Sequence, residues 1–198
     1  MRDAPFLPKP GAFKADFLRY FLLYSFGGVY GDIKQNYLVP LSSLKDSKYD
    51  LLLVRDILEE SPGNPDVQIS FMIAQKSNLQ CFKIALDQIT ENVYKRERRD
   101  HIFSFTGPRL FARALRQSSL VKDKDYKFIG YQHGNCHISS NKHVPIMVTK
   151  SLEIRNIPSG VYATQWLNND LYNNKPIPHD VHKELEAEYG SVNNPKAS

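Results

Sequence analysis

The chain has 198 residues, of which 41% are hydrophobic and 24% are charged, and this length and composition predict one globular domain. Its formal net charge of +5 comes from scattered basic residues rather than the dense basic tracts of dedicated nucleic-acid binders, so we expect no nucleic-acid partner. The two cysteines, Cys81 and Cys136, lie far apart, which excludes a disulfide framework and a CxxC metal or redox site.

The first predicted element is a helix over residues 11–26. Its apolar residues recur at helical spacing, and the pair Gly27 and Gly28 then provides a stop. The apolar line comprises Ala15, Leu18, Leu22 and Phe26, with Phe17, Phe21 and Tyr24 beside it. The longest apolar stretch, residues 17–24, is interrupted by Arg19 and is less than half as long as a bilayer span, so we expect no membrane-spanning segment.

Strands and helices alternate in the rest of the chain. Residues 29–33 predict a short buried strand that runs into a loop, and residues 51–54 predict a second strand. Later strands are predicted at 67–75, 126–132 and 145–154, and helices at 78–94 and 106–117. The helix at 78–94 carries apolar residues along one face, and Pro108 lies near the first turn of the helix that follows.

This alternation predicts an α/β fold with a partly parallel sheet. The composition stays even until about residue 173, so we expect one domain over residues 1–172. Residues 173–198 are expected to form a C-terminal tail that holds at most one short helix.

The segment 14–34 (KADFLRYFLLYSFGGVYGDIK) places polar groups where an ordinary α/β domain has apolar ones. Asp16 and Arg19 are three residues apart, so they share one face of the predicted helix and could pair at the surface or address a ligand together. Asp32 ends the next strand, at the carboxyl edge where open α/β sheets bind their ligands. The segment therefore indicates a phosphate, metal or sugar site.

The same segment resembles the signature of the DXD-containing sugar transferases of glycosyltransferase family 32. That family includes α-1,6-mannosyltransferases, capsular-polysaccharide transferases and virus-encoded relatives. The matched positions, with unbroken spacing, are Ala15, Asp16, Arg19, Tyr20, Gly27, Gly28, Tyr30 and Asp32. The resemblance extends more weakly over most of residues 12–172. It implies a GT-A-like fold, and since few residues precede the helix at 11–26, part of the N-terminal βαβ unit of that fold is expected to be missing.

The resemblance also implies roles for individual residues. Asp16 and Arg19 would hydrogen-bond hydroxyls of the donor sugar, and the matched Gly28 and Tyr30 would belong to the same donor-sugar site. Asp32 would face the ribose and the metal-bound diphosphate, with Mn²⁺ or Mg²⁺ as the implied cofactor. A carboxylate and a guanidinium at fixed separation suit this task because charge-assisted hydrogen bonds to neutral hydroxyls orient a sugar.

Lys34 departs from the family pattern, because it stands where the second Asp of the DXD motif is expected; the resulting DIK resembles the form in virus-encoded relatives. An ammonium group cannot ligate a divalent cation. Three alternatives remain open. Lys34 could supply positive charge to the diphosphate as a catalytic residue, it could point away and leave the metal on Asp32 alone, or catalysis could be weakened or lost.

Two further residues are candidates by position. Asp56, after the strand at 51–54, would be an acceptor-side carboxylate, although an Asp that caps a loop is an equal alternative. Trp166, the only tryptophan, lies in a segment that resembles the family's closing segment over the site, where it would stack on a base or sugar; a core tryptophan is the alternative.

The site predicted at residues 14–34 and its resemblance to family 32 together imply a glycosyltransferase that moves a hexose from a nucleotide-diphosphate sugar to a hydroxyl of a glycan or other acceptor. Retention of the anomeric configuration is implied by the resemblance only. The alternative is a non-catalytic module that binds a nucleotide sugar or a glycan and is derived from such an enzyme, which Lys34 and the short N-terminal part would favour.

Overall fold

The computed structural model describes residues 11–56, 67–96, 102–133, 136–139 and 144–149. Two of the sequence predictions lie outside these residues. One is the position of Trp166, and the other is the tail at 173–198 with its short helix.

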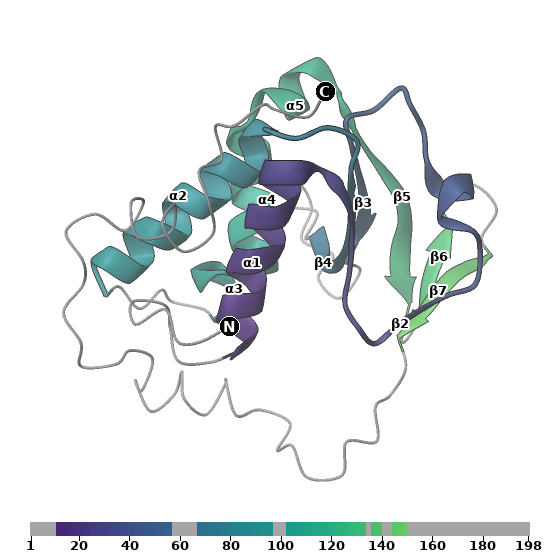
Figure 1. Cartoon of the computed structure of the whole chain (residues 1–198), viewed down its shortest axis with the longest axis horizontal. Helices are drawn as coiled ribbons and strands as arrows, with labels where there is room; N and C mark the ends of the chain where they lie inside the picture. Colours follow the sequence, from purple (N-terminus) through teal and green to yellow (C-terminus); the bar gives the residue numbers. More distant parts are fainter. Residues whose placement is uncertain (1–10, 57–66, 97–101, 134–135, 140–143, 150–198) are drawn as a thin grey trace, which may run out of the picture.

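The α/β class predicted from the sequence is confirmed. The helices are α1 (Gly11–Phe26), η1 (Leu41–Leu44, a 3-10 helix), α2 (Gln80–Tyr94), α3 (Ile102–Phe105), α4 (Pro108–Gln117) and α5 (Ser119–Asp123). The strands are β1 (Gly28–Gly31), β2 (Gln35–Tyr37), β3 (Leu51–Arg55), β4 (Val67–Ala74), β5 (Tyr126–His133), β6 (Cys136–Ser139) and β7 (Pro145–Thr149). Figure 1 shows the α-helices on one side of the central strands and β2, β6 and β7 on the other side.

The sheet has seven strands in the order β1-β4-β3-β5-β6-β7-β2. Its parallel pair is β3 with β5, and the other neighbouring strands are antiparallel, so the partly parallel sheet is confirmed. Because β1 and β3 both run antiparallel to β4, and β5 runs with β3, the carboxyl ends of these three strands lie at one edge of the sheet. We call this edge the carboxyl edge.

The two end strands of this sheet, β1 and β2, follow each other in the chain and are joined by a tight turn. The backbone N–H of Gln35 donates to the carbonyl of Asp32 at 2.8 Å, which makes residues 32–35 a β-turn with Ile33 and Lys34 at its tip. The sheet therefore curls until its ends meet at this turn. The ring of Tyr37 on β2 packs on Phe71 of β4, with 5.8 Å between centroids.

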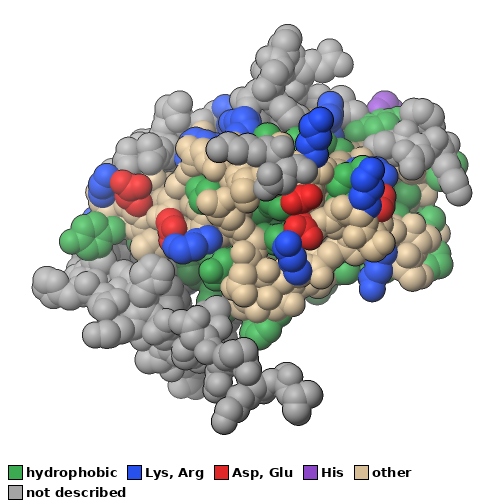
Figure 2. Space-filling model, turned by 90° about the horizontal axis from the view of Figure 1, so that it is seen from above, with side chains coloured by type: hydrophobic (Ala, Val, Ile, Leu, Met, Phe, Trp, Pro, Cys, Tyr) green, Lys and Arg blue, Asp and Glu red, His purple; other side chains and the backbone are tan. Residues whose placement is uncertain are grey.

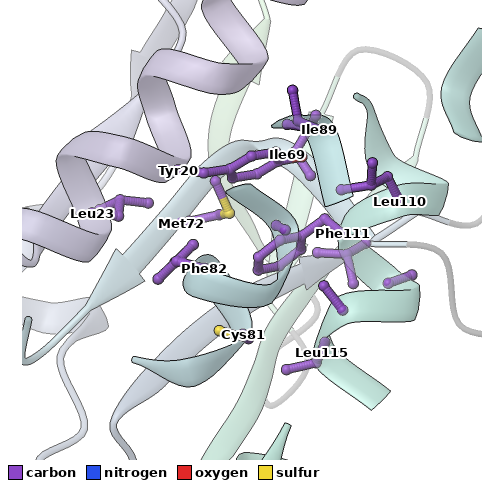
Figure 3. Close-up of a cluster of buried hydrophobic side chains, with 14 of the residues drawn as sticks. Tyr20, Leu23, Ile69, Met72, Cys81, Phe82, Ile89, Leu110, Phe111 and Leu115 are labelled. Atoms are coloured by element: carbon purple, nitrogen blue, oxygen red, sulfur yellow. The ribbon is translucent and has the colours of Figure 1, made fainter. Parts of the chain in front are cut away.

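The larger apolar core lies between the sheet and helices α1, α2 and α4. Its centre is a stack of aromatic rings: Tyr20 on α1 lies 5.1 Å from Phe111 on α4, and Phe82 on α2 lies 5.3 Å from Phe111, measured between ring centroids. Figure 3 shows these rings together with Leu23, Met72 and Leu110. All of these side chains are buried, so this cluster fixes α1 against the sheet.

Helices α1, α2 and α4 are close to the predictions, whereas the short elements η1, α3, α5, β2 and β6 were not predicted. Helix α2 begins two residues later than predicted and buries Phe82, Ala85, Ile89 and Val93 as the periodicity indicated. Pro108 opens α4, after Gly107 at its N-cap. The later start of α2 follows from Asn78, whose positive φ of 60° keeps it out of the helix.

Two predictions were wrong about burial. The face of α1 that meets the core comprises Phe13, Phe17, Tyr20 and Leu23, whereas Leu22 and Phe26 of the predicted line are exposed. Strand β1 is not buried, since it lies at an end of the sheet; Val29 is exposed, and Ile33 beyond it is 97% exposed. Strand β7 (Pro145–Thr149) confirms the first half of the strand predicted at 145–154, and residues 150–154 lie outside the described residues.

Candidate functional site

The candidate site lies where α1 crosses the carboxyl edge, and its central group is the guanidinium of Arg19. Arg19 Nη1 donates to the carbonyl of Ile69 on β4 at 2.7 Å, and its Nε donates to the carbonyl of Ala15 at 3.3 Å. Only 7% of the Arg19 side chain is exposed. The buried face of α1 thus carries a charge next to Tyr20, a residue of the apolar core.

Two carboxylates face the same nitrogen of Arg19. Its Nη2 lies 3.2 Å from Asp16 Oδ1 and 3.6 Å from Asp32 Oδ1. The surface ion pair that the sequence allowed for Asp16 and Arg19 is therefore wrong: the pair is buried, with 13% of the Asp16 side chain exposed. Asp32 is 30% exposed, so it is the carboxylate of the three-residue cluster most open to a ligand.

Tyr30 joins the cluster from β1. Its hydroxyl donates to Asp32 Oδ1 at 2.9 Å, and the Arg19 guanidinium carbon lies 4.8 Å from the centre of its ring. We call Asp16, Arg19, Tyr30 and Asp32 the edge cluster. It brings together four residues that the sequence predicted as one site.

Thr106 completes the cluster from the loop before α4, a contact that sequence reasoning missed. Its hydroxyl donates to Asp16 Oδ2 at 2.7 Å, across 90 residues of chain. The hydroxyl of Tyr20 donates to the carbonyl of Thr106 at 3.2 Å, which ties the same loop to α1. The Thr-Gly-Pro sequence indicated a turn here, but no local pattern indicates its contact with Asp16.

The glycine pair connects α1 to β1. Gly27 has φ +65°, and a Cβ on it would lie 3.0 Å from the carbonyl carbon of Lys76, so a side chain there would be both strained and crowded. Gly28 has φ +92° with open space at its Cβ position. The reversal at this pair turns the chain from the helix directly into the strand that carries Tyr30 and Asp32.

Burial and charge set the protonation of the cluster. Burial raises the pKa of Asp16 to about 6, although Arg19 and the hydrogen bond from Thr106 oppose this rise. Burial acts to lower the pKa of Arg19, but the neighbouring Asp16 and Asp32 help to raise it overall, so the guanidinium stays charged. Burial, with the charge and hydrogen bond of Asp32, raises the pKa of Tyr30 to about 12, so its hydroxyl remains a donor at neutral pH.

Three other predicted site residues are not members of the edge cluster. Lys34 is exposed at the tip of the turn, two residues after Asp32. Asp56 directly follows β3 at the carboxyl edge, with β4 between its strand and that of Asp32. Trp166 falls outside the described residues.

The described residues offer little to a divalent cation. They contain no group of three or more His, Cys, Asp or Glu side chains placed to hold one. The carboxyl oxygens of Asp16 are engaged by Arg19 and Thr106, and Oδ1 of Asp32 already accepts the Tyr30 hydroxyl. Asp32, with 30% of its side chain exposed against 13% for Asp16, is the carboxylate more accessible to a cation.

Two further observations concern the charge on the surface and the character of the helices. Figure 2 shows acidic side chains among the basic ones on the face in view, without a continuous basic area over its coloured part. None of the helices in the described part of the chain has the length and apolar character to cross a membrane.

Comparison with known proteins gives three findings. Residues 8–50, less than a quarter of the chain, match the family described as the glycosyltransferase sugar-binding region containing the DXD motif. The structure is similar to a solved one described as PaToxG Glycosyltransferase, with a TM-score of 0.40 and 22% identity; the similarity covers 54% of this chain and 35% of that chain. No curated protein matches the chain significantly. The matched segment includes α1, the turn at 32–35 and all four residues of the edge cluster.

Proposed function

We propose that this chain is a GT-A-like glycosyltransferase that moves a sugar, a hexose, from a nucleotide-diphosphate donor to a hydroxyl of a glycan or other acceptor. The family match over residues 8–50 supports glycosyl transfer, and the alternative of a non-catalytic binding module gains no support from that match. Retention of the anomeric configuration is part of the proposal on the resemblance to family 32.

The observation that carries the proposal is the buried charge of the edge cluster. Replacing a buried ion pair by apolar side chains is often neutral or stabilising, so stability alone gives no reason for Asp16 and Arg19 to form a pair at little-exposed positions of α1. Carboxylates and a guanidinium held at fixed positions are instead suited to orient a ligand of many neutral hydroxyls. The partly open Asp32 gives such a ligand access.

The proposed roles follow from the contacts. Arg19 orients both carboxylates, and the remaining lone pairs of Asp16 and Asp32 accept hydrogen bonds from hydroxyls of the sugar and ribose. Tyr30 holds Asp32 through its hydroxyl, and Gly28 leaves room beside β1 for the donor. Asp56, at the same edge, is the candidate for the acceptor side.

The proposed reaction depends on the relative position of donor and acceptor and on positive charge near the diphosphate, rather than on a nucleophile of the protein. The bond between the anomeric carbon and the diphosphate oxygen breaks while the acceptor oxygen forms its bond to that carbon, and the proton of the acceptor hydroxyl passes to the departing diphosphate oxygen. Holding donor and acceptor close together on the same face of the anomeric carbon lowers the barrier, and positive charge stabilises the negative charge that grows on the departing diphosphate.

A donor screen tests the proposal. Binding and hydrolysis of UDP- and GDP-linked hexoses would be measured for the native chain and for Asp32→Asn and Asp16→Asn. Asp87→Asn, an exposed carboxylate on α2 paired with Lys83, is the matched control. We expect binding of at least one donor, a loss of about tenfold or more in both site variants and no change in the control. A native chain that binds none of the donors, or site variants that match the control, would contradict the proposal.

A further inference from the structure

We infer that the Lys34 ammonium, presented by the turn at 32–35, binds the donor diphosphate in place of a divalent cation. This inference rests on the proposed function, because it names what holds the diphosphate in the same site. It is carried by the geometry of the turn, by the charges at the edge and by the donor set around Asp32.

The turn is held from both sides. The backbone N–H of Asp32 donates to the carbonyl of Ser70 on β4 at 2.9 Å, and Gln35 Nε2 donates to the hydroxyl of the same serine at 3.0 Å. The hydroxyl of Thr149 on β7 then donates to Gln35 Oε1 at 3.2 Å. Ser70 therefore fixes the first and last residues of the turn, and its tip keeps one position at the carboxyl edge.

Lys34 is free to bind a ligand from this position. It is exposed, and no other side chain in the described ranges forms a hydrogen bond or an ion pair with it. Three other lysines differ in this respect, because Lys76, Lys83 and Lys127 each pair with an aspartate. A lysine ammonium with three donors on a flexible stem binds phosphate oxygens as a point charge.

The charge at this edge also matches the inference. A lysine in place of an aspartate makes the turn more positive by two unit charges, which equals the charge that Mn²⁺ or Mg²⁺ would bring. With Lys34, the carboxylates of Asp16 and Asp32 are balanced by two cations of the chain itself. The negative charges of the two aspartates at the site are therefore already balanced before the diphosphate binds.

The same arrangement disfavours a cation. Magnesium and manganese ions prefer several oxygen ligands, whereas Asp32 offers one carboxylate whose Oδ1 is engaged by Tyr30 and faces Arg19. An ammonium two residues away and a guanidinium at 3.6 Å add repulsion. The residues present therefore fit an anion better than a divalent cation.

The first experiment measures Mn²⁺ binding directly, by electron paramagnetic resonance, on the full chain without any donor. We expect no site in the native chain with a dissociation constant below about 1 mM and a new site in Lys34→Asp, which pairs a second carboxylate with Asp32. An Mn²⁺ site in the native chain that Asp32→Asn removes would overturn the inference. Failure of Lys34→Asp to gain a site would overturn it as well, because position 34 would then not face the Asp32 carboxylate.

The second experiment measures binding of UDP, GDP and inorganic pyrophosphate by calorimetry in EDTA. We expect binding by the native chain, a loss of about 10- to 100-fold in Lys34→Gln, recovery in Lys34→Arg and no change in the control Lys83→Gln. Diphosphates that bind only with Mn²⁺ would overturn the inference and leave the proposed function intact. No binding with or without Mn²⁺ would overturn both.

Discussion

Arg19 and Tyr20 are neighbours on α1, yet they belong to two regions with opposite requirements. The ring of Tyr20 lies in the aromatic core against Phe82 and Phe111, where its contacts are apolar and the fit of the side chains decides the packing energy. Arg19 lies in the edge cluster, where buried charges are satisfied by named partners. The core should thus tolerate a side chain of similar volume, whereas the edge cluster should tolerate only a side chain of the same charge.

The largest expected effect is that of Arg19→Met, which keeps much of the side-chain volume and removes the charge. It leaves Asp16 buried without its cation, so the free energy of unfolding should fall by about 3 to 5 kcal/mol, measured by urea denaturation. Adding Asp16→Asn should recover part of this loss, because it removes the unpaired charge. Lys83→Met, which breaks an exposed pair on α2, is the control and should change stability by less than about 1 kcal/mol. If Arg19→Met lowered the free energy of unfolding no more than the control, the ion pairs of Arg19 would contribute no more to stability than an exposed ion pair does.

A core substitution should have a similar effect on stability and none on binding. Phe82 is fully buried, so Phe82→Ala should lower the free energy of unfolding by about 3 to 4 kcal/mol through the cavity that it leaves. Phe82→Leu should cost about half of that. Donor affinity, measured by calorimetry on folded protein, should match the native chain in both variants. Weakened donor binding by Phe82→Leu would mean that core and edge are coupled.

Asp16→Asn tests the raised pKa of Asp16. Between pH 4 and 6 the unfolded chain loses this proton before the folded chain does, so the Asp16 contribution to native stability falls as pH rises. Asn does not ionise, so the unfolding free energy of the variant relative to the native chain should rise by up to about 3 kcal/mol from pH 4 to pH 7. Urea denaturation at four pH values measures this. If the difference in unfolding free energy between the variant and the native chain stayed constant over this pH range, the pKa of Asp16 would not be raised by folding.

Tyr30→Phe should have the smallest effect. It removes the hydrogen bond to Asp32 at a half-buried position and keeps the ring next to Arg19, so stability should fall by about 1 kcal/mol. Donor binding should weaken more than stability, because Asp32 loses the contact that orients it. The ratio of donor affinities at equal folded protein measures this, with Tyr94→Phe, an exposed tyrosine at the end of α2, as the control. If Tyr30→Phe and Tyr94→Phe changed the donor affinity by the same ratio, Tyr30 would have no role in donor binding.

Local patterns in the sequence predicted the three longest helices and five of the strands, and they missed the short elements β2, β6, η1, α3 and α5. Local residues determine three of these features: the helical conformation of α1, its end at Gly27 and Gly28, and the start of α4 at Pro108. The apolar spacing of α2 likewise predicted its buried face, since polar residues occupy the opposite face. Helix α1 is apolar on nearly all sides, and there the periodicity pointed to the wrong face.

The sequence by itself also indicated that Asp16, Arg19 and Asp32 belong together, because the helix, the glycine pair and the strand that follow one another place them near one edge of the sheet; Tyr30 was added to them only by the family resemblance. Only the tertiary structure decided that Arg19 is buried, that Thr106 binds Asp16 and that Ser70 holds the turn carrying Lys34. These contacts join residues that are tens of positions apart. Their partners are selected by the packing of α1, β4 and the loop before α4, which no local pattern encodes.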